Sequence, residues 1–145
     1  MIDLPNLKQN VSLAPLTTYK IGGPAEWFVE VTTKDELTNA VIQARQAKIP
    51  YFILGCGANI LIRDGGIKGL VIHNRANSVR FAGCAVFAES GTTIENLITM
   101  SRDRELSGLE HFVGIPSTVG GAIRQNLHFL SPDRKSTLFI DSVVE

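Results

Sequence analysis

The sequence predicts an α+β fold built from two small α/β lobes. Capped helices begin at two places, near residues 33 and 92, and a strand-like apolar run precedes each of them. Two glycine-rich loops, around residues 55–66 and 114–122, add to this pattern. Glycines that lie in loops of an α/β frame, outside its periodic segments, favour a nucleotide-like ligand.

The first lobe is predicted at about residues 18–75, after a lead-in segment formed by residues 1–17. Residues 26–31, 51–54 and 69–72 have the length and the apolar composition of strands. A strand, a helix and a second strand in this order are typical of a βαβ unit. This order predicts a parallel sheet with a right-handed crossover.

The helix of this unit is predicted to begin after Thr33 and to end before Pro50. Thr33 as N-cap, with Glu36 three residues later, has the spacing of a capping box. Four residues at helical spacing form the face that should pack on the sheet: Leu37, Ala40, Val41 and Ala44.

The second lobe is predicted at about residues 76–145. Residues 79–81 and 85–88 flank a glycine and indicate a hairpin. Thr92 and Glu95 have the spacing of a second capping box. The helix that follows should pack through Ile94, Leu97, Ile98 and Ser101.

Residues 55–59, Gly-Cys-Gly-Ala-Asn, directly follow the strand at 51–54. Two glycines one residue apart let backbone N–H groups turn the same way and approach an anion, so this loop is a candidate phosphate site. A tight turn between two buried strands is the alternative, and the residues leave both open. The loop lacks the third glycine of a dinucleotide-binding Rossmann fingerprint and the Gly-Lys-Ser/Thr of a Walker A loop.

The second glycine-rich stretch covers residues 114–122. Pro116 suits a first helical position, and Ser117 and Thr118 supply hydroxyl groups at the same turn. Gly120 and Gly121 would allow a flat group to lie against the backbone. A helix start packed closely against the sheet is the alternative.

Composition excludes several classes of function. The 145 residues are 44% hydrophobic, which suits one globular domain with a buried core. Fourteen basic residues balance fourteen acidic ones without a basic run, which argues against nucleic acid or an anionic membrane as partner. The N-terminus resembles no signal peptide and no apolar run reaches membrane-spanning length, so we expect a cytoplasmic protein.

The side chains that could bind a metal do not form a metal-binding pattern. Cys56 and Cys84 are expected to be reduced thiols, Cys56 as a small packed side chain. Trp27 is expected in the core. Three isolated histidines should be solvated or bonded locally: His73, His111 and His128.

These motifs together resemble the N-terminal part of the MurB family of flavoenzymes. The matching segments follow the family's order and spacing over most of residues 17–126: 18–25, 54–61, 63–66 with Gly69, 107–110, and 114–122 with Asn126. The resemblance implies an FAD-binding domain of the vanillyl-alcohol-oxidase type over residues 1–145, with FAD between its two lobes. The family's substrate-binding domain is absent from this chain.

The resemblance also implies two groups of FAD contacts. Backbone amides of the first loop would hold the pyrophosphate: Gly55, Cys56, Gly57, Ala58, Asn59, Ile60 and Leu61. The second group would lie along the flavin: Gly114, Ile115, Pro116, Ser117, Thr118, Gly120, Gly121, Ala122 and Asn126. The Asn59 side chain is expected to reach phosphate, and a Gly57→Val change is expected to abolish FAD binding while leaving the helices folded.

The sequence departs from the family in four places. Cys56, Ala58 and Ser117 replace residues that are usually glycine or serine, which keeps the side chains small. Residues 127–133 differ from the family's usual run, which changes the expected shape of the substrate-side loop. Residues 139–145 resemble a strand that is cut short, so we expect the chain to be part of a longer protein. No catalytic residue is assigned, because the family's catalytic arginine, serine and glutamate lie downstream.

The implied activity is that of a reductase in peptidoglycan precursor synthesis, and therefore in cell-wall biogenesis and cell shape. NADPH would reduce FAD, and FAD would reduce the UDP-sugar substrate UDP-N-acetylglucosamine-enolpyruvate to UDP-N-acetylmuramate. This chain by itself is expected to bind FAD weakly and to be inactive. The alternatives are a non-catalytic module that binds FAD or another nucleotide, and a flavin oxidase of the same fold with another substrate.

Overall fold

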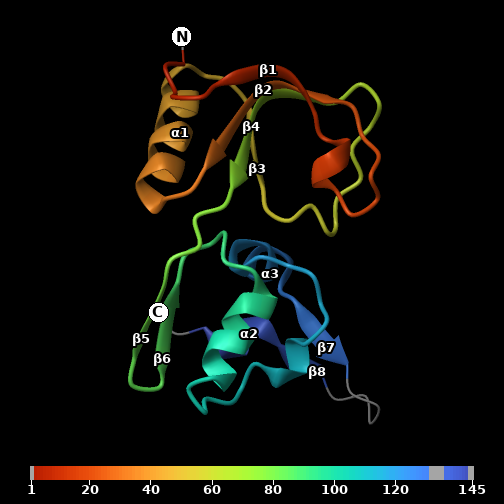
Figure 1. The fold of residues 1–145 in the computed structure, drawn as a ribbon. Helices are drawn as coiled ribbons and strands as arrows, with labels where there is room; N and C mark the ends of the chain where they lie inside the picture. Colours follow the sequence, from red (N-terminus) through yellow and green to blue (C-terminus); the bar gives the residue numbers. More distant parts are fainter. Residues whose placement is uncertain (1, 131–135, 144–145) are drawn as a thin grey trace. The chain divides into compact units, whose positions relative to one another are not determined.

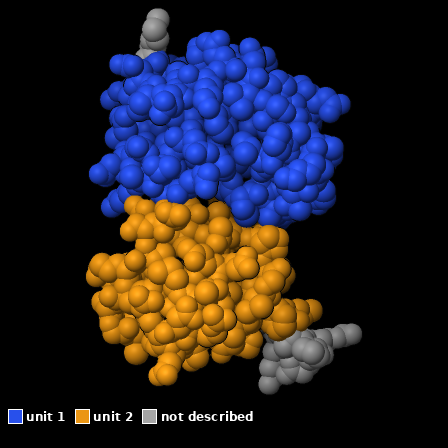
Figure 2. Space-filling model, in the orientation of Figure 1, with its two compact units in different colours: residues 1–76 blue, residues 77–145 orange. Residues whose placement is uncertain are grey.

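The computed structural model describes residues 2–130 and 136–143, and the chain divides into two compact units, residues 1–76 and 77–145 (Figures 1 and 2). Each unit combines strands with helices. The α+β class predicted from the sequence is therefore confirmed.

The first unit is built on one sheet with the strand order β1-β2-β4-β3. Its strands are β1 (Lys8–Ser12), β2 (Pro24–Val31), β3 (Tyr51–Leu54) and β4 (Ile67–Asn74). Strands β2 and β3 both run parallel to β4, which confirms the predicted parallel sheet. Strand β4 lies between the two strands of the βαβ unit.

The expectation that residues 1–17 form only a lead-in segment was wrong, because they contain strand β1. It pairs antiparallel with β2 at the edge of the sheet, from Lys8 opposite Phe28 to Ser12 opposite Pro24. Four of its five residues are exposed, and only Val11 packs against a core cluster. An edge strand held mainly by backbone hydrogen bonds carries little apolar alternation, so no periodic pattern predicts it.

Helix α1 (Lys34–Gln46) has the predicted start and the predicted buried face. The Thr33 side chain accepts a hydrogen bond from the Glu36 N–H at 3.2 Å. The Glu36 carboxylate reaches one residue past the N-cap and accepts from the Thr32 N–H at 2.7 Å, which holds the pKa of Glu36 below its ordinary value. Ala40 and Ala44 are fully buried.

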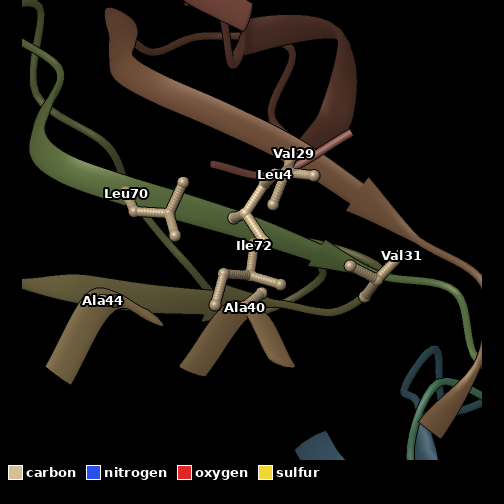
Figure 3. Packing of buried hydrophobic residues seen from close by; sticks show 7 residues of the cluster. All are labelled: Leu4, Val29, Val31, Ala40, Ala44, Leu70 and Ile72. Carbon is tan, nitrogen blue, oxygen red and sulfur yellow. The ribbon is translucent and has the colours of Figure 1, made fainter. Parts of the chain in front are cut away.

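Two apolar clusters cover the two faces of this sheet. Helix α1 closes the first cluster, which Figure 3 shows: Leu4, Val29, Val31, Ala40, Ala44, Leu70 and Ile72. The second contains Leu13, Ala25, Phe28, Leu54, Ile62 and Val71. Leu13 directly precedes the 3-10 helix Ala14–Leu16, and Ile62 lies in the loop between β3 and β4, so both segments are anchored in this core.

The second unit contains a hairpin, two helices, a further strand pair and short 3-10 turns. Its elements are β5 (Val79–Ala82), β6 (Ala85–Ala88), α2 (Ile94–Arg102), η2 (Glu110–Phe112), α3 (Val119–Gln125), β7 (His128–Leu130), β8 (Ser136–Leu138) and η3 (Phe139–Ser142). The predicted hairpin is confirmed, because β5 and β6 pair antiparallel. The core contains Ile94, Leu97, Phe112, Val119, Ala122 and Phe139.

Helix α2 begins one residue later than the sequence predicted. The N-cap is Thr93, whose side chain accepts from the Asn96 N–H at 3.2 Å. Thr92 is fully buried, and its hydroxyl has no hydrogen-bond partner among the described residues. Its carbonyl accepts from the Val119 N–H at 2.8 Å, so the backbone of Thr92 is tied to the start of α3. The predicted helix face is confirmed by the burial of Ile94, Leu97 and Ser101, with Ile98 partly buried.

The strand predicted at 139–145 is wrong over residues 139–142, which form the 3-10 helix η3. Phe139 is buried and meets Phe112 edge to face, with ring centroids 5.3 Å apart. This contact buries Phe139 in the core of the second unit, so the apolar residues predicted as a strand instead pack against that core. Residues 144–145, and residues 131–133 of the segment expected to reshape the substrate-side loop, lie outside the described residues.

Candidate functional site

The first candidate loop, residues 55–61, follows the carboxyl end of β3 in the first unit. Cys56, Asn59 and Leu61 are exposed, Leu61 to 71%. The N–H groups of residues 56–58 donate to no backbone carbonyl of the described residues. These donors are therefore not used in backbone pairing, and residues 55–61 include no carboxylate that would repel an anion.

Gly57 is required by the packing of the chain itself. Its φ is 66°, in the left-handed region, and a Cβ atom there would lie closer than 3.0 Å to the Leu16 carbonyl oxygen. The Gly57 carbonyl accepts from the Thr18 N–H at 3.1 Å. The Gly57→Val prediction assumed that a side chain at position 57 would block the cofactor, but a Cβ atom there already overlaps the Leu16 carbonyl. The expected loss of FAD binding stays a prediction.

The segment around residues 17–24 packs backbone to backbone on the loop that contains Gly57. The Gly23 N–H donates to the Arg63 carbonyl at 3.0 Å. A Cβ atom at Gly23 would overlap the Asp64 carbonyl, and one at Gly66 would overlap the Pro24 carbonyl. In the sequence these two segments are separate motifs, and the glycines clustered in both are the signal that they pack together.

The second candidate segment, residues 114–126, lies in the second unit. Gly114 has φ 79°, and a Cβ atom there would have no neighbour within 4 Å. Thr118 is the N-cap of α3 and accepts from the Gly121 N–H at 3.2 Å. Pro116 lies two residues before this cap, so the prediction of Pro116 at the first helical position was wrong.

Gly120 and Gly121 pack against the chain itself. The Gly120 N–H donates to the Ser90 carbonyl at 2.8 Å, and a Cβ atom at Gly120 would lie 3.1 Å from the Ser90 Cβ. At Gly121 the nearest atom would be the Ser117 hydroxyl, at 3.0 Å. The alternative is therefore supported in part: the helix start is closely packed, but its contacts are with the turn at Ser90 and with Ser117, not with a strand.

The remaining residues of this segment differ in exposure. Ala122 is fully buried in the core of the second unit, so its side chain offers no surface to a ligand. Asn126 is exposed and ends α3 in the left-handed conformation, with φ 49°. Ile115 is partly buried against the same core. Each predicted group of FAD contacts thus forms one continuous segment of one unit, and the contacts themselves remain predictions.

The carboxylate of Glu110 closes the turn before this segment. It accepts from the Gly108 N–H at 2.5 Å. Hydrogen bonds from its own backbone N–H and from Gly108 hold the pKa of Glu110 below its ordinary value. An exposed carboxylate that stays ionised and bonded to backbone is a structural group here and a poor proton donor.

The other residues singled out in the sequence have local roles. Trp27 packs against the first core, as predicted. His73 lies 3.0 Å from the Glu30 carboxylate, and His111 stacks on Phe129. Cys56 is a free, exposed thiol, so the prediction of a packed side chain was wrong. Within the described part of the chain no group of His, Cys, Asp and Glu could hold a metal, and no helix is long and apolar enough to cross a membrane.

Comparison with known families gives one domain match. Residues 25–138 match the family described as FAD binding domain. This range includes both candidate segments and most of each unit.

The chain is also similar to proteins named UDP-N-acetylenolpyruvoylglucosamine reductase. It is 39% identical over 127 residues to the one from Clostridium novyi, with 87% of this chain and 41% of that protein covered. For the one from Synechococcus sp. the identity is 41% over 122 residues, with 83% and 39% covered. The chain thus spans about two fifths of the length of these relatives.

A solved structure supports the same fold. The crystal structure of UDP-N-acetylenolpyruvylglucosamine reductase (MurB) from Thermus caldophilus matches with a TM-score of 0.67 and 28% sequence identity. The match covers 92% of this chain and 52% of that chain.

Proposed function

Because the chain belongs to the FAD binding domain family, and within it to the N-terminal FAD-binding part of the MurB reductases, we propose that it binds FAD. The observation that carries the proposal is the family match over residues 25–138, which contains two segments with backbone suited to this ligand. The proposal assigns the pyrophosphate to residues 55–61 and the flavin to residues 114–126.

The first loop fits a pyrophosphate. An anion needs donors that are close together and not already used, and the backbone N–H groups of residues 56–58 donate to no backbone carbonyl of the described residues. The side chains at positions 56 and 58 are small. The Asn59 side chain would add a contact to phosphate.

The second segment fits a flat ring at one position in particular. Gly114 has open space where a side chain would be, and its positive φ keeps that position favourable for glycine. Gly120 and Gly121 already pack against Ser90 and Ser117, so their part in flavin binding would come through the backbone of the helix start.

FAD, when bound, supplies reversible acceptance and donation of a hydride. In the complete protein we propose the reaction of the named relatives, reduction of UDP-N-acetylglucosamine-enolpyruvate with NADPH as hydride donor, in the cytoplasm. The residues of this chain would bind and orient the cofactor. The relatives are named reductases, and nothing favours the flavin oxidase or the non-catalytic module.

The two free cysteines provide a matched test of the first loop. Cys56 and Cys84 are both exposed, but only Cys56 lies in the proposed pyrophosphate site. A carboxylate at position 56 would repel the pyrophosphate, and at about 5 Å the repulsion in a partly solvated site amounts to a few kcal/mol before salt screening. We expect Cys56→Asp to weaken FAD binding at least about tenfold, whereas Cys56→Asn and Cys84→Asp should bind like wild type.

FAD fluorescence quenching on titration would measure these affinities, with circular dichroism as the check on folding. A wild-type chain that does not bind FAD at concentrations up to about 1 mM would refute the proposed function. Equal affinities for Cys56→Asp and Cys84→Asp would remove residues 55–61 from the site.

A further inference from the structure

The turn that supports Gly57 is held together by a buried hydroxyl group. Thr17 is only 1% exposed, and its hydroxyl lies 3.1 Å from the carbonyl oxygens of both Ala14 and Ile21. The Lys20 N–H donates back to the Thr17 carbonyl at 3.2 Å. Leu13, fully buried in the second core cluster, anchors the start of this turn. The turn is therefore fixed before any ligand binds.

This turn contacts the candidate loop at Gly57 from two sides. The Leu16 carbonyl occupies the space of a side chain at Gly57, and the Thr18 N–H donates to the Gly57 carbonyl. With these two contacts in place, Gly57 has a left-handed backbone conformation and no room for a Cβ atom, so only glycine fits.

The second contact also determines the direction of an amide in the loop. The Gly57 carbonyl and the Ala58 N–H belong to one planar trans peptide unit, in which they point in opposite directions. Since the Thr18 N–H holds the carbonyl, the Ala58 N–H must point away from the turn. That N–H is one of the donors assigned to the pyrophosphate.

We propose that Thr17 and Thr18 are positioning residues for the cofactor loop, although neither is assigned a contact with the cofactor. Thr17 fixes the turn, and the Thr18 N–H orients the Gly57–Ala58 peptide so that its amide faces the pyrophosphate. This inference rests on the proposed function of residues 55–61. It gives Thr17 and Thr18 a role in cofactor binding, although no FAD contact is assigned to either residue.

The Thr18 N–H can be removed without disturbing the residue before it. Thr17 has φ −113° and ψ 150°, which is the conformation that a residue before proline adopts. Thr18→Pro deletes the donor to Gly57, whereas the conservative Thr18→Ala keeps it and removes only an exposed side chain. Loss of one such hydrogen bond should weaken FAD binding roughly three- to tenfold in the proline variant.

A second pair tests the buried hydroxyl. Thr17→Val has nearly the same shape without the hydroxyl, and Thr17→Ser restores it. Thr38→Val is the matched control, since the Thr38 hydroxyl also donates to a backbone carbonyl, that of Lys34 in α1, far along the chain from the loop. We expect weaker FAD binding for Thr17→Val, recovery in Thr17→Ser and no change for Thr38→Val.

A positioning role predicts which ligands are affected. ADP carries the pyrophosphate and riboflavin carries none, so the affinity for ADP should fall by the same factor as that for FAD, and the affinity for riboflavin should not fall. In ¹⁵N NMR spectra of the unliganded protein, the Ala58 amide resonance should move in Thr18→Pro and stay in place in Thr18→Ala. A general loss of stability would not produce this pattern.

The outcomes separate the two proposals. A wild-type chain that binds neither FAD nor ADP would overturn the proposed function and this inference with it. If the wild type binds FAD and both Thr18→Pro and Thr17→Val bind it with the same affinity, the inference alone is overturned. It is also overturned if Thr18→Ala loses as much FAD affinity as Thr18→Pro. If Thr18→Pro does not fold, the Thr17 pair decides.

Discussion

Replacing Gly57 with alanine should destabilise the first unit even when no FAD is present. The left-handed conformation costs a residue with a Cβ atom about 1–2 kcal/mol. The overlap with the Leu16 carbonyl forces the loop to move and breaks the hydrogen bond from Thr18, worth about 1 kcal/mol. The two costs together predict a loss of roughly 2–3 kcal/mol in the free energy of unfolding.

Gly65 is the matched control in the same loop. A Cβ atom there would have no neighbour within 4 Å, and its φ is outside the left-handed region. Gly65→Ala should therefore be neutral, or stabilising by about 0.4–1 kcal/mol, because alanine restricts the unfolded chain.

The assay uses the single tryptophan of the chain. Trp27 lies in β2 and packs against the core of the first unit, so its fluorescence in urea reports the unfolding of that unit. Suppose that, without FAD, the free energy of unfolding of Gly57→Ala is within about 0.5 kcal/mol of the wild-type value, and that this variant nevertheless fails to bind FAD. The glycine would then serve the ligand, and the packing explanation would be refuted.

Four further substitutions test the caps and the acidic turn. Thr33→Ala and Thr93→Ala should each cost about 0.5–2 kcal/mol in urea denaturation followed by circular dichroism, because each removes an N-cap. Thr92→Val should leave the free energy of unfolding unchanged or raise it by about 1–3 kcal/mol, because it removes a buried hydroxyl without a partner among the described residues. A loss of stability as large as that of Thr93→Ala would show that Thr92 is the N-cap. Glu110 has its pKa held below the ordinary 4.5, so its stabilising effect is present above that pH and is lost as the pH falls through the lowered pKa. Glu110→Gln should lower the melting temperature at pH 7, and the difference from wild type should disappear as the pH falls through the lowered pKa of Glu110.

Local signals predicted helix α1 of the first unit well. The Thr33 cap depends on atoms within four residues, and the spacing of Ala40 and Ala44 alone selects the buried face. Both were correct for that reason.

The predictions that failed depended on distant contacts. Two adjacent threonines offer equal caps in the sequence, and the backbone bond from Val119 to Thr92 leaves the cap to Thr93. Strand β1 is specified by its partner β2, and the burial of Phe139 by Phe112. In each case the deciding contact joins residues at least 12 positions apart, which a local sequence pattern does not contain.

Glycine motifs show the limit of sequence reasoning most clearly. A glycine that lets a ligand approach and a glycine that lets another chain segment approach meet the same requirement, so the sequence cannot separate them. In this chain Gly23, Gly57 and Gly66 admit backbone carbonyls of the protein, whereas Gly114 faces open space. Residues 55–61 are therefore shaped by the packing of residues 13–18, and the phosphate affinity that we propose for them should depend on residues 13–18 as well as on the loop itself.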